Sequence, residues 1–146
     1  MGVDAGPVKI IIRYRDGKLL KGYTNDFFPN KPAFHVQFGA EAADQLIETT
    51  MSELKSIVVT VSELKAVFFV KDFKGDPGYT ERRFEEGDRP AGRKVEVTFC
   101  DGEVIVGTTM GYDPKRVGFF VIPADPQANN LRVFVVTEAV RQFRYL

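Results

Sequence analysis

Cysteine and histidine are nearly absent: the 146 residues include one of each, Cys100 and His35. A single cysteine forms no internal disulfide, so a reducing cytoplasm is the simplest compartment. It cannot complete a zinc site either, and one histidine rules out a metal site built from several histidines. We expect an incidental thiol at Cys100 and a packed or edge imidazole at His35. The sequence therefore predicts no metal and no other cofactor.

An excess of one charge is also missing, because 20 Lys and Arg residues balance 20 Asp and Glu residues. Long-range attraction to a polyanion needs a basic excess, so this balance disfavours general nucleic-acid binding. No apolar run reaches transmembrane length and the N-terminus lacks the regions of a signal peptide, so we expect no membrane association.

The common catalytic signatures are absent. Neither a G-x-x-x-x-G-K-[ST] loop nor a G-x-G-x-x-G fingerprint occurs. The paired carboxylates Glu85 and Glu86 lie in a segment rich in Gly and Pro, where nothing rigid would fix their separation for acid–base chemistry. We therefore predict that the protein is not an enzyme.

What the sequence does contain is an internal repeat. Positions 85 residues apart match without a gap over about 30 residues. Near the end of each copy the match resumes at a spacing of 76 residues. The matched pairs are Asp16-Gly17 with Asp101-Gly102, Gly22 with Gly107, Phe27 with Tyr112, Pro29 with Pro114, Phe34 with Phe119, Val36 with Val121, and Phe69-Val70 with Tyr145-Leu146. The chain is predicted to be a duplication with one loop of different length.

Each copy shows the alternation of apolar and polar residues that is typical of half-buried strands. Val8, Ile10 and Ile12 would face one side of a strand while Lys9 and Arg13 face the other. The Asp-Gly pairs predict hairpins with type I′ turns. Gly22 and Gly107 would sit inside a strand, where glycine marks a bulge or a tight bend. A polar break at Ser62-Glu63 and near Glu138 separates the last two strands.

We therefore predict a mainly β fold of two tandem five-stranded small barrels. The first barrel would span 1–70, with a short helical insert at about 40–55 that carries apolar residues at helical spacing. A charged linker, 71–92, would separate it from a second barrel at 93–146. The aromatic residues Phe73, Tyr79 and Phe84 indicate that this linker lies on the barrels.

The order of hairpin, strand glycine, aromatic-Asp turn and final strand pair resembles the Sm-like or SH3-like small barrels. In the Sm family, RNA is held by an Asp-x-x-x-Asn-type loop and by an Arg-Gly or Lys-Gly loop. Tyr112-Asp113 resembles the start of the first motif, but Arg116-Val117 stands where its Asn should be. The second loop carries Glu63 in one copy and Glu138 in the other, and a carboxylate there would repel phosphate.

The phrases LKAVFFVKDFKGDP and GYDPKRVGFFVIPADP also resemble an uncharacterised bacterial family of such barrels, sometimes attached to PilZ domains that bind cyclic di-GMP. Arg89-Pro-Ala-Gly-Arg93 matches the RxxxR half of the PilZ nucleotide motif. The companion Asp/Asn-x-Ser-x-x-Gly motif is absent, so the stretch leaves a nucleotide-binding role open.

These patterns favour a cytoplasmic protein-interaction module, such as a regulator or adaptor in bacterial signalling, whose partner is another protein. Basic and aromatic residues at loop tips form the candidate surface, because binding groups tend to lie there: Phe27, Phe28, Arg82, Arg83, Phe84, Tyr112, Asp113, Lys115 and Arg116. The alternative is RNA or single-stranded DNA binding by stacking on Tyr112, Phe28 and Phe120. Homo-oligomerisation is left open, since each half alone is of marginal size.

Overall fold

The computed structural model describes residues 7–38, 56–75 and 78–146. The expected mainly β class is confirmed, because the described residues form ten strands and two short 3-10 turns. Their bounds are β1 Val8–Tyr14, β2 Leu19–Thr24, β3 Ala33–Gln37, β4 Ser56–Thr60, η1 Val61–Glu63, β5 Leu64–Val70, β6 Arg93–Phe99, β7 Val104–Thr109, β8 Gly118–Pro123, β9 Asn130–Val136, η2 Thr137–Ala139 and β10 Val140–Tyr145.

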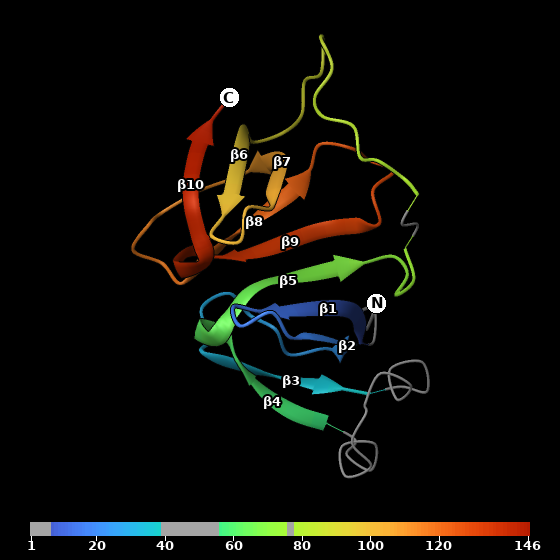
Figure 1. The fold of residues 1–146 in the computed structure, drawn as a ribbon, viewed down its shortest axis with the longest axis vertical. Coiled ribbons are helices and arrows are strands. Elements are labelled where there is room, and N and C mark those ends of the chain that lie inside the picture. The colour runs from blue at the N-terminus through green and yellow to red at the C-terminus, as the bar shows by residue number, and fades with distance from the viewer. Residues whose placement is uncertain (1–6, 39–55, 76–77) are drawn as a thin grey trace, which may run out of the picture.

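The strands form one antiparallel sheet in the order β10-β6-β7-β8-β9-β5-β1-β2-β3-β4. The prediction of two closed barrels is therefore wrong, since the two halves are joined edge to edge. Figure 1 shows the half that contains β6–β10 stacked on the half that contains β1–β5, with β9 and β5 side by side at the junction. The predicted helical insert at about 40–55 lies outside the described residues.

The junction follows from the composition of two strands. All seven residues of β5 are buried, and so are the last four of β9. A strand that is apolar on both faces needs cover on both faces. Pairing β5 with β9 supplies that cover, because alternate side chains of each strand enter different cores.

The two hydrophobic cores therefore share these strands. One contains Phe68 of β5 and Val135 of β9 with residues of the second half, and the other contains Phe69 and Phe134 with residues of the first half. Each buried Phe or Val stabilises the fold by roughly 1.5–3 kcal/mol relative to an exposed one. Neither half closes a core of its own.

The repeat predicted from the sequence recurs in the backbone. A Cβ on Gly22 would lie 2.6 Å from Val36 Cγ1, and one on Gly107 would lie 2.7 Å from Val121 Cγ1 and 2.1 Å from the Ile122 carbonyl oxygen. Both glycines thus allow the same close approach of the next strand at a bend. The two polar breaks are equivalent as well, since each forms a 3-10 turn.

The Asp-Gly hairpins form, but their turn type differs from the prediction. Gly17 has φ +98° and Gly102 has φ +95°, whereas no described residue other than glycine has a positive φ. A type I′ turn needs positive φ at both central positions, so it is excluded here. Gly17 N donates to Tyr14 O, and Tyr14 N donates to Lys18 O. These bonds define a three-residue loop, in which a type I turn is followed by glycine in the left-handed region.

The described part of the linker lies against the strands, as predicted. Phe73 is buried beneath Tyr23, with ring centroids 5.3 Å apart. Lys94 Nζ sits 4.9 Å from the centre of the Phe84 ring. The linker therefore packs along both halves.

Candidate functional site: a groove at the junction

A groove of about 530 Å³ opens where the two halves meet. Most of its walls come from the end of β7, the β7–β8 turn and β8, and Pro29 reaches it from the first half. We call it the junction groove, and its lining residues are Pro29, Thr108, Thr109, Met110, Gly111, Tyr112, Asp113, Arg116, Gly118, Phe119, Phe120, Ile122 and Phe134. It is larger than three other hollows of about 260, 440 and 230 Å³ on the part of the chain that the structure describes.

The groove exists because β7 and β8 separate soon after they meet. Only Gly107–Pro123 and Thr108–Ile122 pair between these strands. Beyond them, Thr109 turns its hydroxyl inward and donates to the Phe120 carbonyl at 2.8 Å. Thr24 makes the same bond to the His35 carbonyl in the first half. The hydroxyl satisfies a carbonyl that the ladder leaves open, so the gap is stable.

The base of the groove is aromatic. The Phe120 ring lies 5.2 Å from that of Phe134 and 6.1 Å from that of Phe69. On the other side, Tyr112 stacks on Phe143 at 3.8 Å and meets Phe119 edge-on at 4.9 Å. Each of these rings contacts at least one other ring. They form a rigid apolar surface.

Exposed apolar side chains border this surface. Met110 is 84% exposed and Ile122 is 47% exposed, although both belong to the groove lining. Isolated exposed apolar residues need no explanation, but two of them beside one hollow make the junction groove the candidate site.

Cations without an acidic partner gather beside the groove. Asp113 shapes the turn, because its Oδ1 accepts from Lys115 N at 2.9 Å and its carbonyl accepts from Arg116 N at 3.0 Å. Across the described residues, neither the Lys115 nor the Arg116 side chain forms an ion pair. Their charge is directed to solvent at the groove mouth.

Arg132 adds a third cation at the same junction. Its guanidinium lies 4.3 Å from the Phe69 ring centre and 4.6 Å from that of Phe120. Burial lowers the pKa of this guanidinium from its ordinary value. The planar group stacks on the two rings and leaves its N–H donors without a carboxylate in the part of the chain that the structure describes.

The predicted surface residues divide into separate places. Tyr112, Asp113 and Arg116 line the groove. Phe27 is half-buried and packs on Phe34 at 5.0 Å, so it belongs to the first-half core. Phe28 is 51% exposed beneath Lys31 and does not line the groove. Sequence reasoning missed Met110, Ile122 and Arg132, because only the folded sheet brings them to one place.

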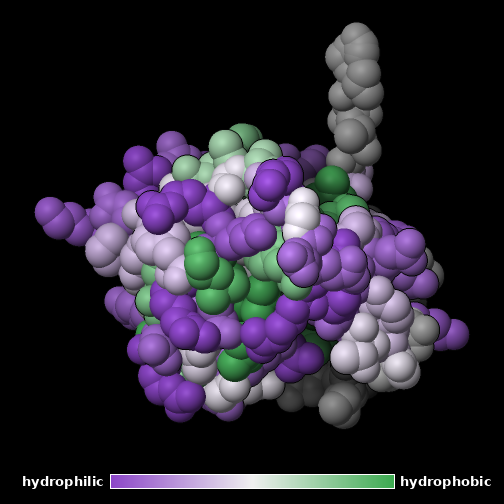
Figure 2. Space-filling view, turned by 90° about the horizontal axis from the view of Figure 1, so that it is seen from above, coloured by the Kyte–Doolittle hydropathy of each residue, from purple (hydrophilic) through white to green (hydrophobic). Residues whose placement is uncertain are grey.

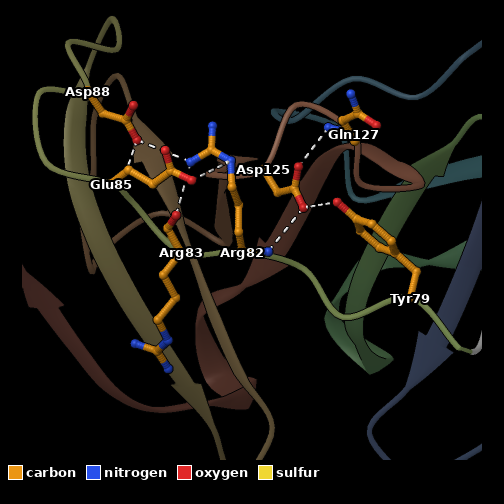
Figure 3. A network of polar contacts seen from close by, with 7 residues as sticks. All are labelled: Tyr79, Arg82, Arg83, Glu85, Asp88, Asp125 and Gln127. Carbon is orange, nitrogen blue, oxygen red and sulfur yellow. Dashed lines mark hydrogen bonds and ion pairs between the residues drawn. The ribbon is translucent and has the colours of Figure 1, made fainter.

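The linker residues Arg82, Arg83 and Phe84 lie elsewhere. Arg82 pairs with Asp88 at 3.3 Å, and Arg83 pairs with Glu96 at 3.0 Å. Figure 3 shows the Arg82 guanidinium beside Glu85 and Asp88, whereas the Arg83 side chain points away from them. Their charges are matched within the chain, so they contribute less to an outward-facing surface than Lys115 or Arg116.

A buried carboxylate fixes this linker to the second half. Asp125 Oδ2 accepts from the Tyr79 hydroxyl and from Arg82 N, and Oδ1 accepts from Gln127 N at 2.8 Å (Figure 3). The Tyr79 hydrogen bond and then the Arg82 amide lower the pKa of Asp125 below its ordinary value. We call these four residues the Asp125 network. Its donors are all used internally, so its role is to hold the linker.

The single histidine is also part of a local structure. His35 Nδ1 lies 2.7 Å from Asp26 Oδ2, and His35 N donates to Asp26 Oδ1 at 2.9 Å. Burial opposes ionisation of Asp26, but the bonds to His35 outweigh it and lower the pKa of Asp26. Among the residues that the structure describes, no group of three or more His, Cys, Asp or Glu side chains is arranged to hold a metal.

No helix among the described residues has the length and apolarity needed to cross a membrane.

Comparison with protein-family models places residues 6–146 in a family of unknown function, DUF6982. The match spans almost the whole chain, so the protein belongs to this family. No curated protein and no solved structure matches the chain.

Proposed function

We propose that the chain is a non-enzymatic protein-interaction module that binds an extended segment of another protein in the junction groove. One observation carries the proposal: a rigid aromatic hollow lies beside cations that have no acid to pair with among the described residues. Such a module serves as an adaptor or regulator.

The chemistry of the groove selects the partner segment. Phe120, Ile122 and Met110 offer an apolar surface for one hydrophobic anchor side chain, which would gain most from leaving water. Arg116 at the mouth, with Lys115 next to it, favours a carboxylate close to that anchor. We therefore expect a segment in which a large apolar residue stands next to acidic residues.

Nucleic-acid binding by stacking has less support. An open ring face is needed for each stacked base. Phe143 stacks on one face of Tyr112, and the Arg132 guanidinium already stacks on the Phe120 ring, so at most one face of each ring is left for a base. Phe28 lies under Lys31 and away from the groove lining. A segment of a partner protein binds the groove without any rearrangement of these rings.

Selection from a library of displayed random peptides tests the proposal. Peptides enriched on the full chain are expected to combine an aromatic or long aliphatic residue with Asp or Glu. Arg116→Glu and Ile122→Asp should each weaken their binding by roughly tenfold or more, as for an anchor contact and a charge contact near it. Lys18→Glu is the control, because Lys18 is an exposed cation next to the β1–β2 turn and does not line the groove.

The outcomes separate the candidates. Absence of any enriched peptide, or equal binding by wild type and both groove variants, overturns the proposal. Salt-dependent binding of a single-stranded oligonucleotide that is lost in Arg116→Glu would assign the same surface to the nucleic-acid alternative.

A further inference from the structure

Among residues 7–38, 56–75 and 78–146, no strand pairs with the outer side of β4 or of β10, and we call these two strands the free edges of the sheet. Through the repeat, β4 corresponds to β9 and β10 corresponds to β5, at a spacing of 76 residues. Inside the chain these counterparts pair with each other, since β5 lies against β9. Each free edge is therefore the uncovered copy of a strand that is covered at the junction.

The β10 edge has lost the apolar character of its counterpart. Ala66 and Phe68 of β5 are buried in a core, and the residues that correspond to them are Gln142 and Arg144. Arg144 Nε lies 2.7 Å from Glu96 Oε1. A strand that covered β10 as β9 covers β5 would bury this arginine away from water. Charged residues on an edge strand block such pairing.

The β4 edge has kept the apolar character of its counterpart, β9. Ser56–Thr60 carries no charge, and four of its five residues are β-branched, the type that strands favour. Val58 corresponds to Phe134, which is fully buried at the junction, yet Val58 is 62% exposed. Its cross-strand neighbour His35 corresponds to Phe120 and is also exposed. An unprotected edge of this kind is a template for another strand.

We propose that β4 is a dimerisation edge, where it pairs antiparallel with β4 of a second copy about a two-fold axis at Val58. In that register Val58 faces its symmetry mate, and Ser56 faces Thr60 of the second copy. The sheet then continues across the dimer as one antiparallel layer, like every strand pair within the chain.

Two observations favour a second copy as the occupant. A strand that complements an uncharged, β-branched edge is itself uncharged and β-branched, and β4 is such a strand, so two copies bring no like charges together. Pairing of β4 with β10 of another copy would place Arg144 where Phe68 is at the junction. The symmetric pairing avoids that burial.

The interface is small, so we expect a weak dimer that forms as concentration rises, with a dissociation constant on the order of micromolar or above. Sedimentation of the full chain over a concentration series measures it. Val58→Lys should shift the protein to monomer because two lysines would then face each other at the axis. Val104→Lys is the matched control, since Val104 is an exposed valine on β7, away from β4.

Disulfide trapping tests the register. In a Cys100→Ser background, which removes the one exposed native thiol, Val58→Cys is expected to cross-link into dimers under mild oxidation. Directly opposed residues of an antiparallel pair are about 4.5–5.5 Å apart at Cα, within disulfide range. Thr60→Cys should cross-link much less, because it faces Ser56.

Each contrary result overturns the proposal. These are a wild type that stays monomeric throughout the series, a Val58→Lys variant that still dimerises with unchanged circular dichroism, and equal cross-linking at positions 58 and 60. The proposal is independent of the groove, so peptide binding in the groove is expected to persist in Val58→Lys.

Discussion

At the scale of single residues, the fold depends on a few places where backbones approach closely. Gly107 is the strictest, because a Cβ there would sit 2.1 Å from the Ile122 carbonyl oxygen. A backbone atom cannot move aside as a flexible side chain can. Gly22 occupies the corresponding bend of the first half, where the nearest neighbours are a Val36 methyl and the Gln37 carbonyl oxygen.

Gly107→Ala is therefore expected to lower the free energy of unfolding by about 3 kcal/mol, at the upper end for overpacking. Urea denaturation followed by circular dichroism measures the change. Gly111→Ala is the control, since a Cβ at Gly111 has no atom within 4 Å, and it should shift stability by no more than about 0.5 kcal/mol. Equal effects at the two positions would show that the bend at Gly107 is not what demands glycine.

Lys65 shows how a charged residue is accommodated in the centre of the sheet. It is buried on β5, and its Nζ pairs with Glu103 and, at 2.7 Å, with Asp101. The aliphatic stem is buried and the ammonium group rests over the Phe99 ring. This contact ties β5 of the first half to the first hairpin of the second.

At the scale of elements, the linker is held by hydrogen bonds more than by apolar contacts. The Asp125 network joins it to the β8–β9 loop, and Arg83 joins it to Glu96 of β6. Seen from above the second half, the surface is mostly hydrophilic, with a small hydrophobic area near its centre (Figure 2). The linker thus depends on polar contacts that a single substitution can remove.

Asp125→Ala is expected to release the linker, because three donors lose their acceptor at once. Trypsin should then cleave after Arg82 and Arg83 several-fold faster than in the wild type, while the strands resist. Asp113→Ala is the control, since that exposed carboxylate accepts from the Lys115 amide in a turn outside the linker. An unchanged cleavage rate would show that the network does not restrain the linker.

The same network makes the linker sensitive to acid. The folded state lowers the pKa of Asp125, so its stabilising contribution is present above the ordinary carboxyl pKa of 3.8 and is lost as pH falls through the lower folded value. The network should therefore protect the linker amides from hydrogen exchange at neutral pH. This protection should be lost as the pH falls through the lowered pKa of Asp125. Asp125→Ala should remove the pH-dependent part of this protection.

Local elements were predictable from the sequence, and long-range pairing was not. Short-range sequence patterns are enough to predict the repeat, the Asp-Gly hairpins and the bends at Gly22 and Gly107. Closure of each half depends on which strand β5 pairs with, which is decided by tertiary burial. Leu64–Val70 did carry a signal, since an apolar run without alternation is typical of a strand covered on both faces.

The site was predictable to a similar degree. Tyr112, Asp113 and Arg116 were predicted as surface residues from turn chemistry and loop position, and they line the candidate groove. Phe27 lies against the first-half core, because an aromatic residue in a turn can point into the core as easily as out of it. Arg132 gave no signal, since one of the two rings that hold it, Phe69, comes from β5, far away in the chain.

At the scale of the whole molecule, the two cores share β5 and β9, so neither half should unfold alone. We expect one cooperative transition in urea, with coincident curves from far-ultraviolet circular dichroism and from tyrosine absorbance. Val135→Ala in β9 should shift the whole transition to lower urea and leave it single. Two separated transitions, or an early loss of only one half, would contradict this expectation.

The central strand pair also bears on how the molecule tolerates a broken chain. The halves adhere through β5 and β9 and through Lys65, whereas the peptide connection runs along the outside and passes an exposed turn at Gly87, which has φ +92°. Severing the backbone at that turn would leave two polypeptides that remain associated as one particle. The protein is thus a natural starting point for fragment complementation, in which two separately expressed pieces regain a fold only when they meet.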